Sequence, residues 1–242
     1  MNVLWNEPSE LPANMGSDEL HIWRADLRSP TPDPDALSDQ EQARAARFLS
    51  EPARRRYIAS HLALRGILSA YLHTPPAAVP FTQLENRKPF LPNRAQVRAV
   101  SFSLSRSEDL CLVAVASHTD IGVDIECVHK ARFEAGMADQ VFTSGERAAL
   151  ETILPAERLR AFLLGWTRKE AYAKCIGLGL SADLFHAEVG VKPDATRIQD
   201  IMVTSFMPQE GFLAAWAARD AFHPSFWNWT SAPCVELSPL GA

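Results

Sequence analysis

Three segments with the alternation of β-strands follow one another closely in the middle of the chain. The first two, Val100 to Ser105 and Leu110 to Ser117, are separated by a polar turn at Arg106 to Asp109, which predicts a β-hairpin. Ile121 to Glu126 then alternates strictly and predicts a third strand. This centre favours a protein of the mixed α/β type, in which helices cover a sheet.

Helical patterns lie on both sides of these strands. A capping box of Ser38 and Glu41 opens the first helix, and Pro75 with Pro76 ends the second. The predicted helices are 38–49, 52–72, 144–154 and 157–175. Further strands are predicted at 19–27, 187–191, 201–206 and 212–217, and little pattern is visible after residue 224.

Helices followed by strands occur once before about His118 and again after it. We therefore expect two halves of similar build, an N-terminal half of residues 1–118 and a C-terminal half of residues 119–242.

The composition excludes several classes of protein. The 242 residues are 47% hydrophobic, which suits a globular core, and the net charge of -5 is the wrong sign for general attraction to nucleic acid. The four cysteines are too widely spaced for a zinc site or a disulfide scaffold. No secretory signal is visible, and the longest apolar run, Leu110 to Ala116, cannot cross a bilayer. We expect a soluble cytoplasmic protein with neither nucleic acid nor membrane as partner.

Acidic side chains form the main candidate site. Asp124 and Glu126 share one face of a predicted strand, and two adjacent carboxylates are most simply compensated by a hard divalent cation such as Mg²⁺. Glu170 and Lys174 lie one helical turn apart and can converge on one site. The alternatives are a solvated strand face and an exposed Glu–Lys helix pair. Walker, Rossmann, zincin and serine-hydrolase motifs are all missing from the sequence.

Two segments together resemble the signature motifs of the 4'-phosphopantetheinyl transferase superfamily, in its Sfp-like class. They are Gly122 to Glu126, with the sequence GVDIE, and Trp166 to Lys174, with the sequence WTRKEAYAK. Supporting matches occur in the family's order: the Arg-rich helix 54–65, Lys88-Pro89, the hairpin residues 101–107, Phe142-Thr143 with Glu146, and residues 177–180. The resemblance covers about residues 36–192.

The resemblance implies an α/β (α+β) fold built as a pseudo-dimer of two similar halves, with coenzyme A in the cleft between them. It implies transfer of the 4'-phosphopantetheine group from coenzyme A to a serine of an apo acyl or peptidyl carrier protein. The products would be the holo carrier and 3',5'-ADP, the cofactor would be Mg²⁺, and the enzyme would act as a monomer.

Site residues carry over from the motifs position by position. The resemblance assigns the metal to Asp124, Glu126 and Glu170, and the transferring phosphate to Lys174. Glu170, directly or through a water, is the candidate to accept the serine proton, so Glu170 and Lys174 are the catalytic pair. Contacts with the coenzyme are implied for Arg44, Lys88, Ser105 and Arg106.

The chain departs from the family pattern at a few positions. Arg106 replaces the usual histidine after the hairpin serine, His61 replaces an arginine, and Ser103 replaces an asparagine. Arg106 and His61 both keep a potential cation, and an arginine can hold phosphate through two hydrogen bonds. Because of these departures, an alternative remains open: the chain could be a homologue that binds coenzyme A without catalysing the transfer.

Two further hypotheses remain at this point. The spacing of Asp124, Glu126 and Glu170 also superficially fits a metal-dependent nuclease, although the acidic balance argues against it. Lys130, Arg132 and Phe133 form a basic-aromatic segment that could dock an acidic carrier protein, or they form a plain surface loop. The arginines at 54–56 are interpreted as an ordinary helix start and are left out of the site.

Overall fold

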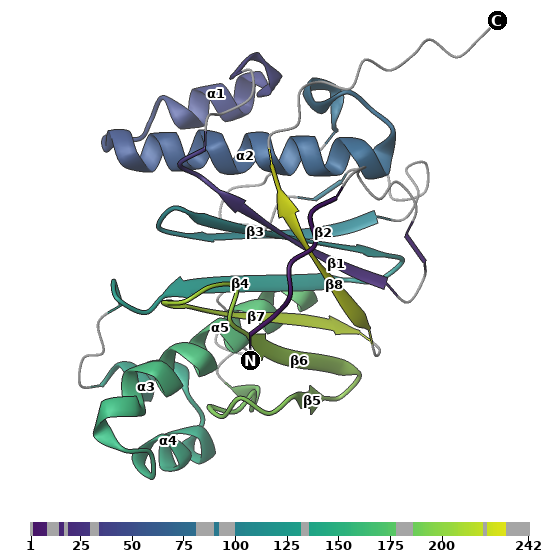
Figure 1. Cartoon of the computed structure of the whole chain (residues 1–242). Helices are drawn as coiled ribbons and strands as arrows, with labels where there is room; N and C mark the ends of the chain where they lie inside the picture. The colour runs from purple at the N-terminus through teal and green to yellow at the C-terminus, as the bar shows by residue number, and fades with distance from the viewer. Residues whose placement is uncertain are drawn as a thin grey trace, which may run out of the picture.

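Two four-stranded sheets lie face to face at the centre of the molecule, and each is covered on its outer side by a long helix (Figure 1). The computed structural model describes residues 2–8, 15–16, 19–29, 34–80, 90–91, 100–131, 136–177, 186–219 and 222–230. Within these ranges the mixed α/β class predicted from the sequence is confirmed.

The first sheet has the strand order β2-β3-β1-β8. Its strands are β1 (Glu19–Asp26), β2 (Val100–Ser107), β3 (Leu110–Ser117) and β8 (His223–Trp229). The first three are antiparallel neighbours, whereas β8 comes from the far end of the chain and pairs in parallel with β1. The hairpin is therefore confirmed, with a turn of two residues, Glu108 and Asp109, shorter than predicted.

The second sheet is antiparallel throughout, in the order β4-β7-β6-β5. Its strands are β4 (Ile121–Cys127), β5 (Thr196–Ile198), β6 (Ile201–Phe206) and β7 (Phe212–Arg219). The predicted strands at 121–126, 201–206 and 212–217 are confirmed by β4, β6 and β7.

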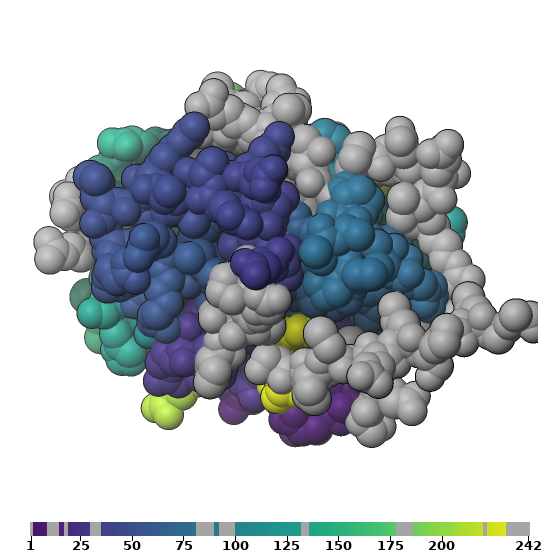
Figure 2. Space-filling model, turned by 90° about the horizontal axis from the view of Figure 1, so that it is seen from above, coloured from purple at the N-terminus to yellow at the C-terminus, as the bar shows by residue number. Residues whose placement is uncertain are grey.

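The helices lie on the two outer faces of this pair of sheets (Figure 1). They are α1 (Asp39–Ala45), α2 (Glu51–Leu72), α3 (Met137–Val141), α4 (Ser144–Glu151) and α5 (Arg158–Ile176), with 3-10 turns at Pro34–Ala36, Pro76–Ala78 and Pro155–Glu157. Seen from above, α1 and α2 form much of the described surface on their side (Figure 2). None of the described helices has the length and apolar character needed to cross a membrane.

The fold has four layers: the helix α2, the first sheet, the second sheet and the helix α5. Buried side chains fill the three spaces between these layers. Leu64 and Leu68 of α2 pack on the first sheet. Ile22 of the first sheet meets Val123 of the second in the core between the sheets. Ala171 of α5 belongs to a third cluster with the outer face of the second sheet. Each sheet thus has one long helix of its own, which accounts for the repeated order of helices and strands in the sequence.

Several element boundaries differ from the predictions. The Ser38–Glu41 capping box is present, but its helix ends at Ala45, before the predicted Leu49. The strand predicted at 187–191 is wrong, because these residues form bends and irregular backbone. β5, α3 and β8 were not predicted from the sequence. The boundary proposed between residues 118 and 119 falls in the connection from β3 to β4, and it stays a prediction.

Candidate active site

Close packing of α5 on β4 brings the two predicted acidic segments together. A methyl group built on Gly122 would lie 1.8 Å from the carbonyl oxygen of Ala171 and 2.7 Å from the amide nitrogen of Cys175. The helix backbone therefore occupies the space that any larger residue at position 122 would need. Gly122, Asp124 and Glu126 share this face of β4, opposite the core residues Val123 and Ile125.

Asp124 is the most buried of the predicted metal ligands, with 5% of its surface exposed. Its Oδ1 atom accepts hydrogen bonds from Lys174 Nζ at 2.6 Å and from Ser105 Oγ at 2.7 Å. Its Oδ2 atom is buried and has no hydrogen-bond partner among the described residues. A buried carboxylate oxygen without a partner is costly, so this atom is suited to a cation ligand.

Glu126 is half-buried between β2 and α5. Its Oε2 atom accepts a hydrogen bond from Ser107 Oγ at 3.0 Å, and its carboxylate also has a side-chain hydrogen bond with Trp166. Burial raises the pKa of Glu126, and the negative charge of Asp124 raises it further. Both hydrogen bonds act in the opposite direction and favour the ionised carboxylate.

Glu170 faces the same group of charges from α5. Burial and then the charge of Asp124 raise its pKa, the charge of Glu126 adds to the rise, and Lys174 lowers it. These mutual influences mean that Asp124, Glu126, Glu170 and Lys174 form one electrostatic cluster. The structure thus brings together the four residues that the sequence placed at the site.

The side chains of this cluster are of the chemical type that binds a cation, although they are not arranged around a common point. Across the described ranges, no group of three or more His, Cys, Asp or Glu side chains is arranged to hold a metal ion. The donor set is nevertheless three carboxylates with one orphaned buried oxygen, and oxygen donors are what Mg²⁺ requires. Lys174 supplies positive charge at Asp124 in this arrangement.

Two of the predicted coenzyme contacts, Ser105 and Arg106, lie on opposite faces of β2. Ser105 points toward β4 and donates to Asp124, whereas Arg106, the next residue, points toward α2, with its Cζ atom 5.6 Å from the centre of the Tyr57 ring. Loss of water around the guanidinium group, and then the like charge of Arg44, lower the pKa of Arg106. Arg44 is exposed on α1. Lys88 lies outside the described residues.

His61 does not offer a free cation. It is buried, with Nδ1 2.8 Å from Glu41 Oε1, and burial lowers its pKa. Arg65 donates to the other oxygen of Glu41 at 2.8 Å, and Ser38 donates to the same atom. This buried network ties α1 to α2, so His61 serves packing in this position.

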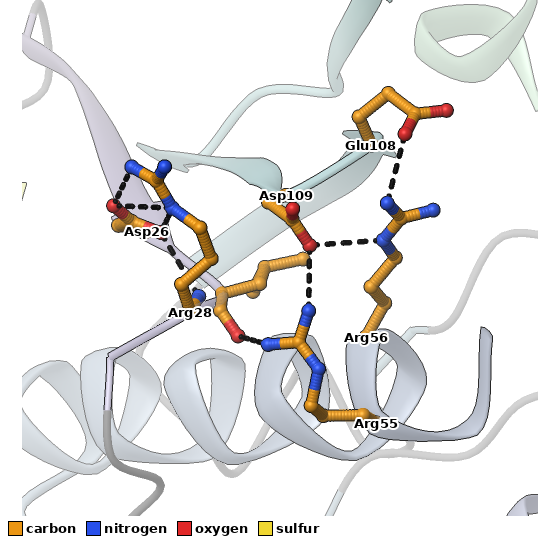
Figure 3. A network of polar contacts seen from close by, with 7 residues as sticks. Asp26, Arg28, Arg55, Arg56, Glu108 and Asp109 are labelled. Atoms are coloured by element: carbon orange, nitrogen blue, oxygen red, sulfur yellow. Dashed lines mark hydrogen bonds and ion pairs between the residues drawn. The ribbon is translucent and has the colours of Figure 1, made fainter. Parts of the chain in front are cut away.

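The arginines at the start of α2 are tied to the β2–β3 hairpin by ion pairs (Figure 3). Arg55 donates to Asp109 at 2.8 Å, and Arg56 contacts both Asp109 and Glu108. Beside them, Arg28, in the turn that follows β1, pairs with Asp26, the last residue of that strand. The network anchors the turn of the hairpin that carries Ser105 and Ser107.

Three residues around the carboxylates were missed by sequence reasoning. Ser103 and Ser107 hydrogen bond to β4, and Trp166 hydrogen bonds to Glu126. The alternation of serines in 101–107 is the signal that could have found the first two. Their hydrogen-bond partners lie on a strand that only the tertiary structure brings alongside.

The helix carrying Glu170 is held from its other side by a buried ion pair. Lys169 Nζ lies 2.8 Å from Glu146 Oε2, and both side chains are almost fully buried. The second oxygen of Glu146 accepts from the amides of Val189 and Gly190. α4, α5 and the segment around residue 189 are thereby joined behind the site.

Comparison with family models matches nearly the whole described fold. A model of the 4'-phosphopantetheinyl transferase superfamily matches residues 120–217, and a model of the N-terminal part of 4'-phosphopantetheinyl transferases matches residues 23–119. The two matches meet in the connection between β3 and β4.

Similar proteins of known name agree with these matches. The 4'-phosphopantetheinyl transferase HetI of Nostoc is 33% identical over 222 residues, which cover 88% of this chain and 93% of HetI. A putative 4'-phosphopantetheinyl transferase of Synechocystis is 28% identical over 74% of this chain and 70% of its own. The 4'-phosphopantetheinyl transferase gsp of Aneurinibacillus migulanus is 26% identical over 60% of this chain and 57% of its own.

Proposed function

Because the chain belongs to the 4'-phosphopantetheinyl transferase superfamily, we propose that it transfers the 4'-phosphopantetheine group of coenzyme A to a serine of an apo carrier protein. The carrier is an acyl or peptidyl carrier, and the second product is 3',5'-ADP. The observation that carries the proposal for this chain is the cluster of Asp124, Glu126, Glu170 and Lys174, which combines three carboxylates and a lysine between β4 and α5.

The proposed cofactor is Mg²⁺, held by Asp124, Glu126 and Glu170. Support comes from the orphaned Oδ2 atom of Asp124 and from the raised pKa of the two glutamates, because a cation would relieve their mutual repulsion. When bound, Mg²⁺ would neutralise negative charge on the pyrophosphate of the coenzyme.

The reaction breaks the phosphoanhydride linkage of the coenzyme and forms a phosphodiester linkage to the carrier serine. The carrier serine oxygen bonds to the β-phosphorus of the coenzyme, and the bond from that phosphorus to the oxygen bridging the α-phosphate breaks. That oxygen leaves with 3',5'-ADP. Glu170, directly or through a water, accepts the serine proton. Lys174 contacts the oxygens of the transferring phosphate.

Coenzyme binding is assigned to the N-terminal half, through Arg44, Lys88, Ser105 and Arg106. The like charges of Arg44 and Arg106 influence each other, which is the arrangement that a phosphate group between them would stabilise. The enzyme is further proposed to act as a monomer in the cytoplasm, since one chain supplies both sheets and both long helices. Size-exclusion chromatography with light scattering tests the monomer.

The decisive experiment is intact mass spectrometry of several apo carrier proteins after incubation with this protein, coenzyme A and Mg²⁺. The expected result is a gain of one phosphopantetheine group on the carrier, which disappears when the carrier serine is replaced by alanine. Tight coenzyme A binding by calorimetry without modification of any carrier would overturn the transferase proposal. It would favour the non-catalytic coenzyme A-binding homologue.

Docking of the carrier beside the site is proposed for the segment that follows β4. Lys130 is exposed there, whereas Arg132 and Phe133 lie outside the described residues. Charge reversal by Lys130→Glu should raise the KM for an acidic carrier and leave the KM for coenzyme A unchanged. An unchanged KM for the carrier would remove Lys130 from the docking surface.

A further inference from the structure

Serine occupies every second position of β2 on the face that meets β4. The four residues, which share this face because side chains alternate along a strand, are Ser101, Ser103, Ser105 and Ser107. The opposite face carries Phe102, which packs in the core beneath α2. The inner faces of a β-sandwich are normally apolar, but this face of β2 is polar and lies against another strand. Its buried hydroxyl groups are therefore expected to have hydrogen-bond partners.

Two of these hydroxyl groups bind the backbone of β4 along its open edge. Among the described strands, β2 and β4 are each the outermost strand of their own sheet. Ser103 Oγ accepts from the amide of Val123 at 3.1 Å, and Ser107 Oγ accepts from the amide of Cys127 at 3.0 Å. The four-residue spacing is the same on both strands, so side chains join the two sheet edges where a backbone ladder would otherwise do so.

Within the described part of the chain, Ser107 has a second hydrogen bond that Ser103 does not have. A hydroxyl group has one proton to donate and lone pairs to accept with. The amide of Cys127 uses a lone pair of Ser107, which leaves the proton for Glu126 Oε2 at 3.0 Å. Trp166 of α5 also hydrogen bonds to this carboxylate. Glu126 is thus held from β2 on one side and from α5 on the other.

We propose that Ser107 is a positioning residue that orients the Glu126 carboxylate for the divalent cation, an inference that rests on the proposed function. A glutamate side chain loses rotational freedom when it binds a metal, and a hydrogen bond that already fixes its orientation reduces that cost. Ser107 itself touches neither the coenzyme nor the carrier in this role. Its effect reaches the reaction only through Glu126.

The test compares Ser107→Thr with Ser107→Val, two side chains of the same shape of which only threonine keeps the hydroxyl group. Both are favoured in strands, so both variants should fold. Mn²⁺ binding is measured without coenzyme by electron paramagnetic resonance of the free ion. Ser107→Thr should bind Mn²⁺ like the wild type, and Ser107→Val should bind about tenfold more weakly, as expected for the loss of a hydrogen bond to a charged group.

A matched control comes from Ser103→Ala, which removes only a contact with the backbone of β4. This variant should lower the thermal unfolding temperature and leave Mn²⁺ affinity unchanged. In transfer assays, Ser107→Val should raise the Mg²⁺ concentration needed for half-maximal rate, while the rate at saturating Mg²⁺ stays close to that of the wild type.

Three outcomes would overturn the inference. Equal Mn²⁺ affinity for Ser107→Val and Ser107→Thr would remove the role of the hydroxyl group. Equal loss of affinity in Ser103→Ala would show that Ser107 acts only by holding the sheet edges together. In either case the wild type still binds Mn²⁺, and the proposed function stands. A wild type that binds no Mn²⁺ would overturn both the metal site and the role of Ser107.

Discussion

Lys174 Nζ lies 2.6 Å from Asp124 Oδ1, so the lysine expected at the transferring phosphate is paired with an aspartate expected at the metal. Both side chains are largely buried, with 22% and 7% of their surfaces exposed. Lys174 therefore supplies at Asp124 the positive charge that a divalent cation would otherwise provide. Binding of the cation and coenzyme should release Lys174 toward the phosphate.

Lys174→Met should tighten Mn²⁺ binding in the absence of coenzyme, because the competing ammonium group is removed while the length of the side chain is kept. An increase in affinity of about tenfold is expected for one charge at this distance in a partly buried site. Transfer activity should fall by at least about a hundredfold, since the phosphate contact is lost. Electron paramagnetic resonance and carrier mass spectrometry measure the two effects.

Lys130→Met is the matched control for this experiment. It removes the same charge from an exposed position after β4 and should leave Mn²⁺ affinity unchanged at physiological ionic strength. Weaker Mn²⁺ binding by Lys174→Met would contradict the idea that Lys174 and the cation compete for Asp124.

Glu170→Gln should abolish transfer without lowering stability. The raised pKa of Glu170 means that its ionised form is disfavoured in the folded protein, so a neutral amide of the same shape relieves repulsion from Asp124 and Glu126. Loss of the proton acceptor should reduce turnover by at least about a hundredfold. Urea unfolding and single-turnover transfer assays check the two parts, and retained turnover would refute the assignment of the site.

The stabilising effect of Mg²⁺ should depend on pH in a defined direction. Glu126 and Glu170 both have a pKa above the ordinary 4.5, so the folded protein retains protons that the unfolded chain releases. These two glutamates contribute to stability at low pH, and this contribution is lost as the pH rises through their pKa values in the folded protein. Mg²⁺ binds the ionised forms, so it should raise the unfolding temperature more at pH 8 than at pH 5. Differential scanning fluorimetry with and without Mg²⁺ measures this.

Arg106→Ala and Arg44→Ala should each raise the KM for coenzyme A by about tenfold, the effect expected when one charged contact with phosphate is lost. Dephospho-coenzyme A, which lacks the 3'-phosphate, is the matched substrate control. If Arg44 and Arg106 hold the 3'-phosphate, the KM for dephospho-coenzyme A should hardly change in either variant. An equal rise for both substrates would place the arginines elsewhere on the coenzyme.

Glu41→Gln should cost about 3 kcal/mol of folding free energy at pH 7, because it breaks a buried ion pair and weakens its hydrogen bonds. Burial opposes ionisation of Glu41, but hydrogen bonds from His61, Arg65 and Ser38 lower its pKa to about 2. Its contribution is present above the ordinary pKa of 4.5 and is lost as the pH falls toward 2. Denaturant unfolding should therefore show the two proteins converging in stability at acid pH.

Local periodicity was sufficient to predict much of the fold and half of the site's geometry. The two-residue period of a strand placed Asp124 and Glu126 on one face, and the four-residue spacing of a helix placed Glu170 beside Lys174. The capping box at Ser38 and the left-handed Gly177 at the end of α5 were also readable, because caps are made by neighbours in the chain.

The strand at the end of the chain shows where such reasoning fails. β8 contains Pro224 and three aromatic residues without clear alternation, Phe226, Trp227 and Trp229, so its sequence predicts no strand. Its conformation comes from parallel pairing with β1, about two hundred residues earlier in the chain. Pairing of this kind depends on the packed sheet and is not encoded in the local pattern.

The sequence by itself determined which chemical groups this protein has and which of them share a strand face or a helix face, since both follow from backbone periods. Only the tertiary structure decided that the faces meet. The absence of a side chain at Gly122 lets α5 approach β4, and the edge of β2 brings Ser105 and Ser107 to Asp124 and Glu126. Burial at this junction then raises the pKa of Glu126 and Glu170, because desolvation depends on what surrounds a group and not on its neighbours in the chain.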